Sequence, residues 1–98
     1  MPTFIDFTQM RSPFGTSPAR AEGLRIASTI DIDALSIDWG AGPIGSDGFR
    51  KGMWKATYDG QPFRFYASVS HAADYDGQMR LLRRHAALHL GLTRSGAK

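Results

Sequence analysis

The sequence of 98 residues contains no cysteine, which excludes disulfide bonds, thiolate nucleophiles and cysteine-ligated zinc. Its N-terminal stretch has no basic region followed by an apolar run, so we expect no secretory signal. No apolar segment approaches the roughly 20 residues that a membrane-spanning helix needs. These absences predict a soluble, cytoplasmic protein that does not act in a membrane.

The sequence also lacks the short motifs of common catalytic and nucleotide-binding sites. The stretch WGAGPIGSDG is rich in glycine, but it has neither the Gly-x-Gly-x-x-Gly nor the Walker spacing. No Gly-x-Ser-x-Gly nucleophile elbow occurs anywhere in the chain. We therefore expect a non-catalytic protein that needs no cofactor.

Charge is unevenly distributed along the chain. Residues 1–48 contain three arginines against six acidic residues, whereas residues 49–98 contain nine lysines and arginines against three aspartates. The basic charge is therefore concentrated in the C-terminal half, which favours an anionic partner.

The strongest local pattern is MWKATYDGQPFRFYASVS, residues 53–70, in which two alternating runs flank Asp59-Gly60. A two-residue Asp-Gly loop favours a type I′ turn and predicts an antiparallel hairpin. With Tyr58 and Gln61 closing the turn, one face is apolar and pairs Ala56 with Phe63, Trp54 with Phe65, and Gly52 with Ala67. The other face pairs Thr57 with Pro62, Lys55 with Arg64, Met53 with Tyr66, and Lys51 with Ser68.

Further strands are predicted before the hairpin. The segment TFIDF, residues 3–7, forms a short first strand in this interpretation, and RSPFGTSP after it is a loop. Apolar residues alternate over 24–32, which predicts a half-buried strand with Asp31 and Asp33 facing solvent. The alternation then shifts by one residue at Asp33-Ala34, through either a β-bulge or a turn, and continues in Leu35, Ile37 and Trp39.

A helix competes with the strand at its start. Ser17 is a suitable N-cap and Pro18 suits the first helical position. Because Gly23 is unfavourable inside a helix, we limit this helix to the residues before it. Residues 1–22 are therefore expected to be a loop-rich N-terminal segment.

The C-terminal part, from Ser70 to Gly91, predicts a long helix. Ser70 is the expected cap, Asp74 favours the first turn, and Gly91 is the expected end. The apolar arc of this helix contains Tyr75, Met79, Leu81, Leu82, Ala86, Leu90 and Leu92. The opposite side carries a basic helix face of Arg80, Arg83 and Arg84.

These elements predict an α+β fold: an antiparallel sheet of three to five strands with one C-terminal helix packed across it. Trp54, Phe63 and Phe65 would then meet Leu82, Ala86 and Leu90. We expect one domain over residues 1–98, with residues 93–98 as a flexible tail.

His85 and His89 have the i, i+4 spacing with which two imidazoles can bind a metal from one helix. Both lie within the apolar arc, and no Glu follows His85 as in His-Glu-x-x-His. The sequence therefore predicts no metal site, and if one existed its candidate ligands would be His85 and His89.

Candidate binding residues gather on the polar face of the hairpin. Like charges directly opposite each other destabilise a sheet, so the Lys55–Arg64 pair calls for an explanation. Cations interleaved with an aromatic residue suit an anionic ligand that can stack, and the candidate set is Lys51, Met53, Lys55, Arg64 and Tyr66. The alternative is an exposed edge whose cations deter aggregation.

Two hypotheses about function follow. The first is a nucleic-acid-binding protein that uses this sheet face, with the basic helix face as a separate, secondary surface. The second is a small phage- or mobile-element-type accessory or inhibitor protein, anti-CRISPR-like in size and composition, that binds a protein or nucleoprotein complex. Its apolar anchor would come from Phe14, Met53 or Tyr66. The expected partner is therefore either a nucleic acid or a protein or nucleoprotein complex.

Overall fold

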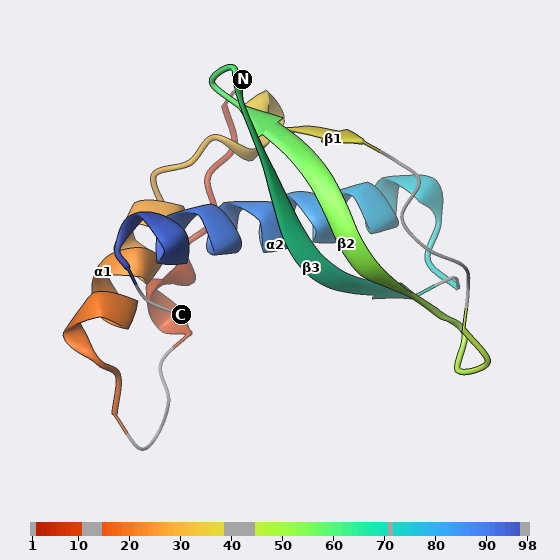
Figure 1. Cartoon of the computed structure of the whole chain (residues 1–98), viewed down its shortest axis with the longest axis horizontal. Helices are drawn as coiled ribbons and strands as arrows, with labels where there is room; N and C mark the ends of the chain where they lie inside the picture. The colour runs from red at the N-terminus through yellow and green to blue at the C-terminus, as the bar shows by residue number, and fades with distance from the viewer. Residues whose placement is uncertain (1, 11–14, 39–44, 71, 97–98) are drawn as a thin grey trace. The chain divides into compact units, whose positions relative to one another are not determined.

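The computed structural model describes residues 2–10, 15–38, 45–70 and 72–96 (Figure 1). The fold is α+β, and the described chain contains a three-stranded antiparallel sheet in the order β1-β2-β3. In chain order the elements are η1 (Phe7–Gln9), α1 (Pro18–Ala27), η2 (Ile32–Ala34), β1 (Ser36–Asp38), β2 (Phe49–Tyr58), β3 (Gln61–Ser70) and α2 (Tyr75–Arg94).

The chain divides into two compact units. Residues 1–33 and 87–98 form one, called here the helical unit, and residues 34–86 form the other, called the sheet unit. Helix α2 contributes to both. None of the helices in the described part of the chain has the length and apolar character needed to cross a membrane.

The hairpin of β2 and β3 is confirmed in its predicted register. Asp59 and Gly60 have φ angles of 53° and 77°, the positive values that a type I′ turn requires. Every predicted cross-strand pair occurs, and the ladder continues to the pair Phe49–Ser70. Residues next to a two-residue loop exchange both backbone hydrogen bonds, so the following pair, Thr57–Pro62, is a non-hydrogen-bonded one. Pro62, which has no N–H, therefore loses nothing at this position.

One face of the hairpin, the inner face, forms the core of the sheet unit. Trp54 and Phe65 are 1% and 0% exposed, and the Trp54 indole N–H donates to the carbonyl oxygen of Ala67 at 3.3 Å. Leu82 and Ala86, from the part of α2 that belongs to this unit, are also buried. Figure 1 shows this part of α2 behind the two long strands. Phe63, which lies on the inner face near the hairpin turn, is only half-buried.

The predicted strand over residues 24–32 is wrong, because α1 continues through Gly23 to Ala27. The cap was predicted correctly: the Ser17 side chain accepts from the backbone N–H of Arg20 at 3.2 Å, and Pro18 begins the helix. A Cβ atom added to Gly23 would lie 2.7 Å from the Leu92 side chain. Glycine at this position permits a close approach between α1 and the end of α2. The packing that this approach allows outweighs the low helix propensity of glycine, so α1 continues through Gly23.

The predicted ends of α2 also need correction. Ser70 does not cap the helix because it still pairs with Phe49 in the sheet; instead the Asp74 carboxylate accepts from the Gly77 N–H at 2.7 Å. Gly91 lies inside α2 and does not end it; a glycine is needed there because a Cβ atom would lie 2.6 Å from the backbone nitrogen of Ala27. Residues 93 and 94, predicted to belong to a flexible tail, continue α2.

The predicted first strand, residues 3–7, does not form. Thr3 instead donates its N–H to the Asp31 carboxylate at 2.9 Å and its hydroxyl to the Asp33 carboxylate at 2.6 Å. The Ile32 N–H in turn donates to the Thr3 carbonyl at 2.9 Å. Asp31 and Asp33 therefore hold the N-terminal segment, whereas the sequence predicted that they only face solvent.

The structure describes residues 28–38 and 45–48 of the segment that connects α1 to the hairpin. Asp33-Ala34 belongs to the 3-10 turn η2, so the shift in alternation is a turn and not a bulge. Leu35 is 2% exposed and Ile37 lies in β1, as the second run predicts. Trp39 lies outside the described residues.

Candidate functional site

The second side of the sheet, called here the outer face, carries every residue of the predicted hairpin site. Lys51, Met53, Lys55, Arg64 and Tyr66 are all exposed there. The side chains of Met53 and Tyr66 are directly paired and are 57% and 61% exposed. A paired methionine and tyrosine open to solvent is an unusual use of apolar area, because such side chains are more often buried.

The structure adds Phe49 to this face. Phe49 alternates in phase with Lys51 and Met53, and it is 40% exposed. Sequence reasoning missed it because the hairpin signal weakens towards the glycine-rich stretch that precedes it. Its position could have revealed it: Phe49 is two residues before Lys51, and side chains two residues apart in a strand lie on the same face.

Along the strands, the outer face alternates between cationic and apolar rows. The rows are Phe49/Ser70, Lys51/Ser68, Met53/Tyr66, Lys55/Arg64 and Thr57/Pro62. Two residues of β-strand separate one row from the next, which corresponds to about 6.6 Å. Positive charge and exposed aromatic surface therefore repeat in a regular order across the face.

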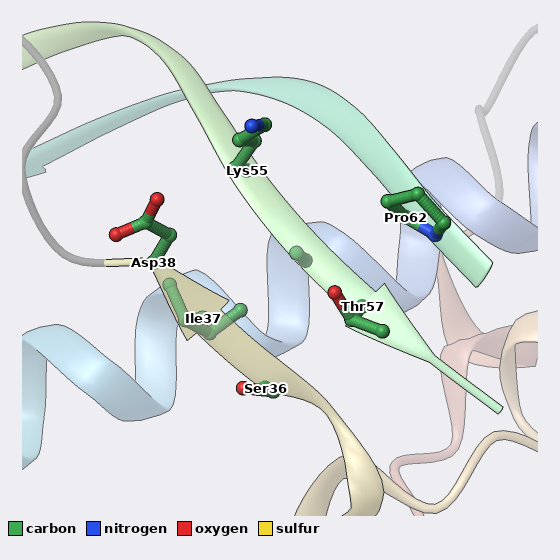
Figure 2. A pocket seen from close by; sticks show the side chains of 7 residues that line it. Ser36, Ile37, Asp38, Lys55, Thr57 and Pro62 are labelled. Atoms are coloured by element: carbon green, nitrogen blue, oxygen red, sulfur yellow. The ribbon is translucent and has the colours of Figure 1, made fainter. Parts of the chain in front are cut away.

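The Lys55–Arg64 pair has a third neighbour that the hairpin alone did not reveal. Strand β1 pairs with β2 so that Asp38 lies opposite Lys55, on the side away from Arg64. Figure 2 shows the side chains of Asp38 and Lys55 rising on the same side of the strands. A carboxylate beside Lys55 offsets part of the repulsion from Arg64. Because β2 is the central strand, Lys55 does not protect an edge; that explanation suits Arg64 on β3 alone.

A second carboxylate contacts Lys51. The Lys51 ammonium lies 2.5 Å from an Asp47 carboxylate oxygen, and Asp47 also accepts from the Phe49 N–H at 3.1 Å. The hydrogen bond from Lys51 is the main cause that lowers the pKa of Asp47, and the same bond raises the pKa of Lys51. Both side chains are about half exposed, so this ion pair can exchange with an incoming anion.

An open hollow of about 400 Å³ is lined by residues of all three strands, at the end of this face that lies near the hairpin turn (Figure 2). All of its lining residues except Ile37 and Ala56 occupy outer-face positions. The lining consists of Ser36, Ile37 and Asp38 from β1, Lys55, Ala56 and Thr57 from β2, and Pro62 from β3. A carboxylate, an ammonium, two hydroxyls and a pyrrolidine ring are thus gathered within one hollow.

The predicted basic helix face is less uniform than expected. Arg80 and Arg84 are exposed, but Arg83 is half-buried, and its Nε atom is enclosed without a hydrogen-bond partner among the described residues. His85 is half-buried, and burial, followed by the charge of Arg84, lowers its pKa. His89 is exposed. Within the described ranges, no three histidine, aspartate or glutamate side chains are grouped closely enough to hold a metal ion.

Comparison with protein-family models, with curated proteins and with solved structures finds no match for this chain. Its function is therefore inferred from the chemistry of the outer face. Phe14, one of the three predicted apolar anchors, lies outside the described residues, which leaves Met53 and Tyr66 for that role.

Proposed function

We propose that this chain binds single-stranded nucleic acid, without catalysis, through the outer face of its sheet. The observation that supports this most directly is the alternation of cationic rows with exposed aromatic side chains on one open face. Phosphates and bases alternate along a nucleic-acid strand, and a binding surface of this kind combines cations for the backbone with aromatic platforms for the bases.

The cations supply the phosphate contacts. Lys55 and Arg64 form a non-hydrogen-bonded pair, the pair type in which side chains lie closest together. A phosphate bound between them replaces repulsion between two cations by attraction to a shared anion. Phosphate binding therefore explains why the chain carries a pair of like charges that by itself destabilises the sheet.

The aromatic residues supply the base contacts. Tyr66 is 61% exposed and Phe49 is 40% exposed, and four strand residues separate the row of Phe49 from the row of Tyr66, about 13 Å. Lys51 lies between those two rows. Stacking on such platforms needs an accessible base face, which a single strand offers and an intact duplex does not.

The carboxylates of Asp38 and Asp47 limit the strength of this binding. Each lies beside one of the cations, so the attraction of the face for phosphate is reduced. With three cations as contacts, we expect a slope of log affinity against log salt of about −2 for a single strand.

Fluorescence anisotropy with labelled single- and double-stranded DNA and RNA, from about 50 to about 300 mM salt, tests the proposal. The decisive variant is Lys55→Glu with Arg64→Glu. Its matched control is Arg80→Glu with Arg84→Glu, which changes net charge equally, on an exposed stretch of α2 in the same unit. Circular dichroism of each variant confirms that it is folded.

We expect the wild type to bind single strands in preference to duplexes, and the sheet-face variant to lose binding. The helix-face control should retain most of its affinity. Tyr66→Ala should weaken binding about tenfold, because stacking on one aromatic side chain contributes on the order of 1–3 kcal/mol per base. If the helix-face variant alone loses binding, or if no strand binds at low salt and tens of micromolar protein, the proposal is wrong.

A second function has one observation in its favour. Phe49, Met53 and Tyr66 are exposed apolar side chains next to charged residues, an arrangement also found where proteins bind other proteins. Under this alternative the chain is a small phage- or mobile-element-type accessory or inhibitor protein. Binding to a protein or nucleoprotein complex would then depend on Met53 and Tyr66 and would respond little to salt. A pull-down with wild type and Met53→Ala, Tyr66→Ala distinguishes this alternative when no free nucleic acid binds.

A further inference from the structure

The hollow at the end of the outer face has no net charge to attract a phosphate. Its lining holds one carboxylate, Asp38, and one ammonium, Lys55, and the repulsion of a phosphate by Asp38 offsets its attraction to Lys55. Arg64 and Lys51 do not line it. The group that enters the hollow when a strand lies on the face is therefore the uncharged part of a nucleotide.

The lining instead suits a sugar. The Asp38 carboxylate accepts hydrogen bonds, the hydroxyls of Ser36 and Thr57 both donate and accept, and the ring of Pro62 offers apolar surface (Figure 2). A ribose within a strand presents the complementary groups: its free 2′-hydroxyl and an apolar ring face. A volume of about 400 Å³ falls within the range of small-ligand pockets.

The position of the hollow fits the order of the rows. Thr57 and Pro62 form the row that follows Lys55 and Arg64, about 6.6 Å further along the strands. A phosphate held by Lys55 and Arg64 therefore places an adjacent sugar at the hollow. Asp38 borders both rows, since it pairs with Lys55 and lines the hollow.

We propose that this hollow binds the 2′-hydroxyl of a ribose, with Asp38 as the acceptor, and that the face thereby prefers RNA to DNA. The inference rests on the proposed function, because it names the nucleic acid that the same face selects. Deoxyribose has no 2′-hydroxyl to donate to Asp38. With DNA the carboxylate therefore makes no such hydrogen bond, and only its repulsion of the strand's phosphates remains.

The test compares three labelled oligonucleotides of one sequence: RNA, DNA and 2′-O-methyl RNA, by fluorescence anisotropy at about 50 mM salt. The wild type should bind RNA about tenfold more tightly than DNA, the loss expected when one hydrogen bond to a charged group is missing. The 2′-O-methyl strand should bind like DNA, because it keeps the ribose but cannot donate.

Asp38→Ala should bring the RNA-to-DNA affinity ratio close to one. Asp38→Asn, which keeps an acceptor, should retain part of it. The readout is the ratio, because loss of a negative charge raises affinity for both strands. Asp47→Asn is the matched control, since it removes a carboxylate that lies beside Lys51 and outside the hollow. It should raise both affinities equally and leave the ratio unchanged.

Equal wild-type affinity for RNA and DNA overturns this inference and leaves the proposed function standing. So does an RNA preference that survives in Asp38→Ala, or one that 2′-O-methyl RNA shares. Absence of binding by every oligonucleotide overturns both. Circular dichroism spectra and thermal transitions of the Asp38 variants show whether a changed ratio comes from a folded sheet.

Discussion

The inner and outer faces of the hairpin come from the same two strands, and adjacent positions along those strands have opposite fates. Trp54 and Phe65 are 1% and 0% exposed, whereas their neighbours Met53 and Tyr66 are 57% and 61% exposed. Both pairs combine an aromatic residue with another large side chain, so residue size does not decide which pair is buried. The comparison teaches that the inner face carries stability and leaves the outer face free to carry cations and exposed aromatic surface.

The largest effect is expected from emptying the inner face. Phe65→Ala removes a fully buried aromatic ring and should lower the free energy of unfolding by about 3–5 kcal/mol. Tyr66→Ala, the adjacent residue on the outer face, should change it by no more than about 0.5 kcal/mol. Urea denaturation followed by circular dichroism measures both. Similar losses for the two variants would show that the outer face is also part of the core.

A smaller loss of stability is expected at Gly52, an inner-face position whose backbone conformation favours glycine. Gly52 has a φ angle of 150°, and a Cβ atom added there would meet nothing within 4 Å. Gly52→Ala should therefore cost about 1–3 kcal/mol through backbone strain alone. A D-alanine at this position, introduced by chemical synthesis, accepts positive φ and should restore stability. Equal losses for both alanines would point to a steric clash.

Arg64→Glu should move stability and binding in opposite directions. The row Asp38–Lys55–Arg64 would then place a cation between two carboxylates, which should stabilise the sheet by about 0.3 kcal/mol. The same change removes a phosphate contact and should weaken nucleic-acid binding. A shift in the urea midpoint, measured beside the anisotropy titration, tests this. Weaker binding together with a lower midpoint would mean that Arg64 contributes to folding.

The smallest effect concerns the Asp47–Lys51 ion pair and depends on pH. The pKa of Asp47 is below its ordinary value of 3.8 in the folded chain, so its contribution is present at neutral pH and is lost as the pH falls through the lowered pKa. The pKa of Lys51 is raised, so its contribution is lost only as the pH rises through that raised value. Asp47→Asn should therefore lower the urea midpoint slightly at about pH 7, and this difference should shrink as the pH falls below 3.8. A difference that does not shrink in acid would assign the effect to another interaction of Asp47.

Much of the sheet unit was predictable because its signals are local. The Asp59-Gly60 turn and the alternation around it specify the register, and the register places Lys51, Met53, Lys55, Arg64 and Tyr66 on one face. The role of Asp38 was not predictable in this way. It depends on pairing between β1 and β2, which are separated in sequence by the glycine-rich stretch.

The helical unit shows the opposite case. The alternation over residues 24–32 is typical of a strand, and Gly23 and Gly91 look like helix ends, yet both glycines lie inside helices. Each is needed because a Cβ at either position would collide with the neighbouring helix. A contact between residues far apart in sequence outweighs the local preference, which amounts to about 1 kcal/mol for a glycine.

By itself the sequence determined the hairpin, its register and the separation of an apolar from a basic face, because turn chemistry and a period of two act over a few residues. Only the tertiary structure decided that residues 24–27 are helical, that Asp31 and Asp33 hold Thr3, and that Asp38 lies beside Lys55. These features arise from contacts between distant segments, whose free energy of packing and hydrogen bonding exceeds the small local propensities that a sequence displays.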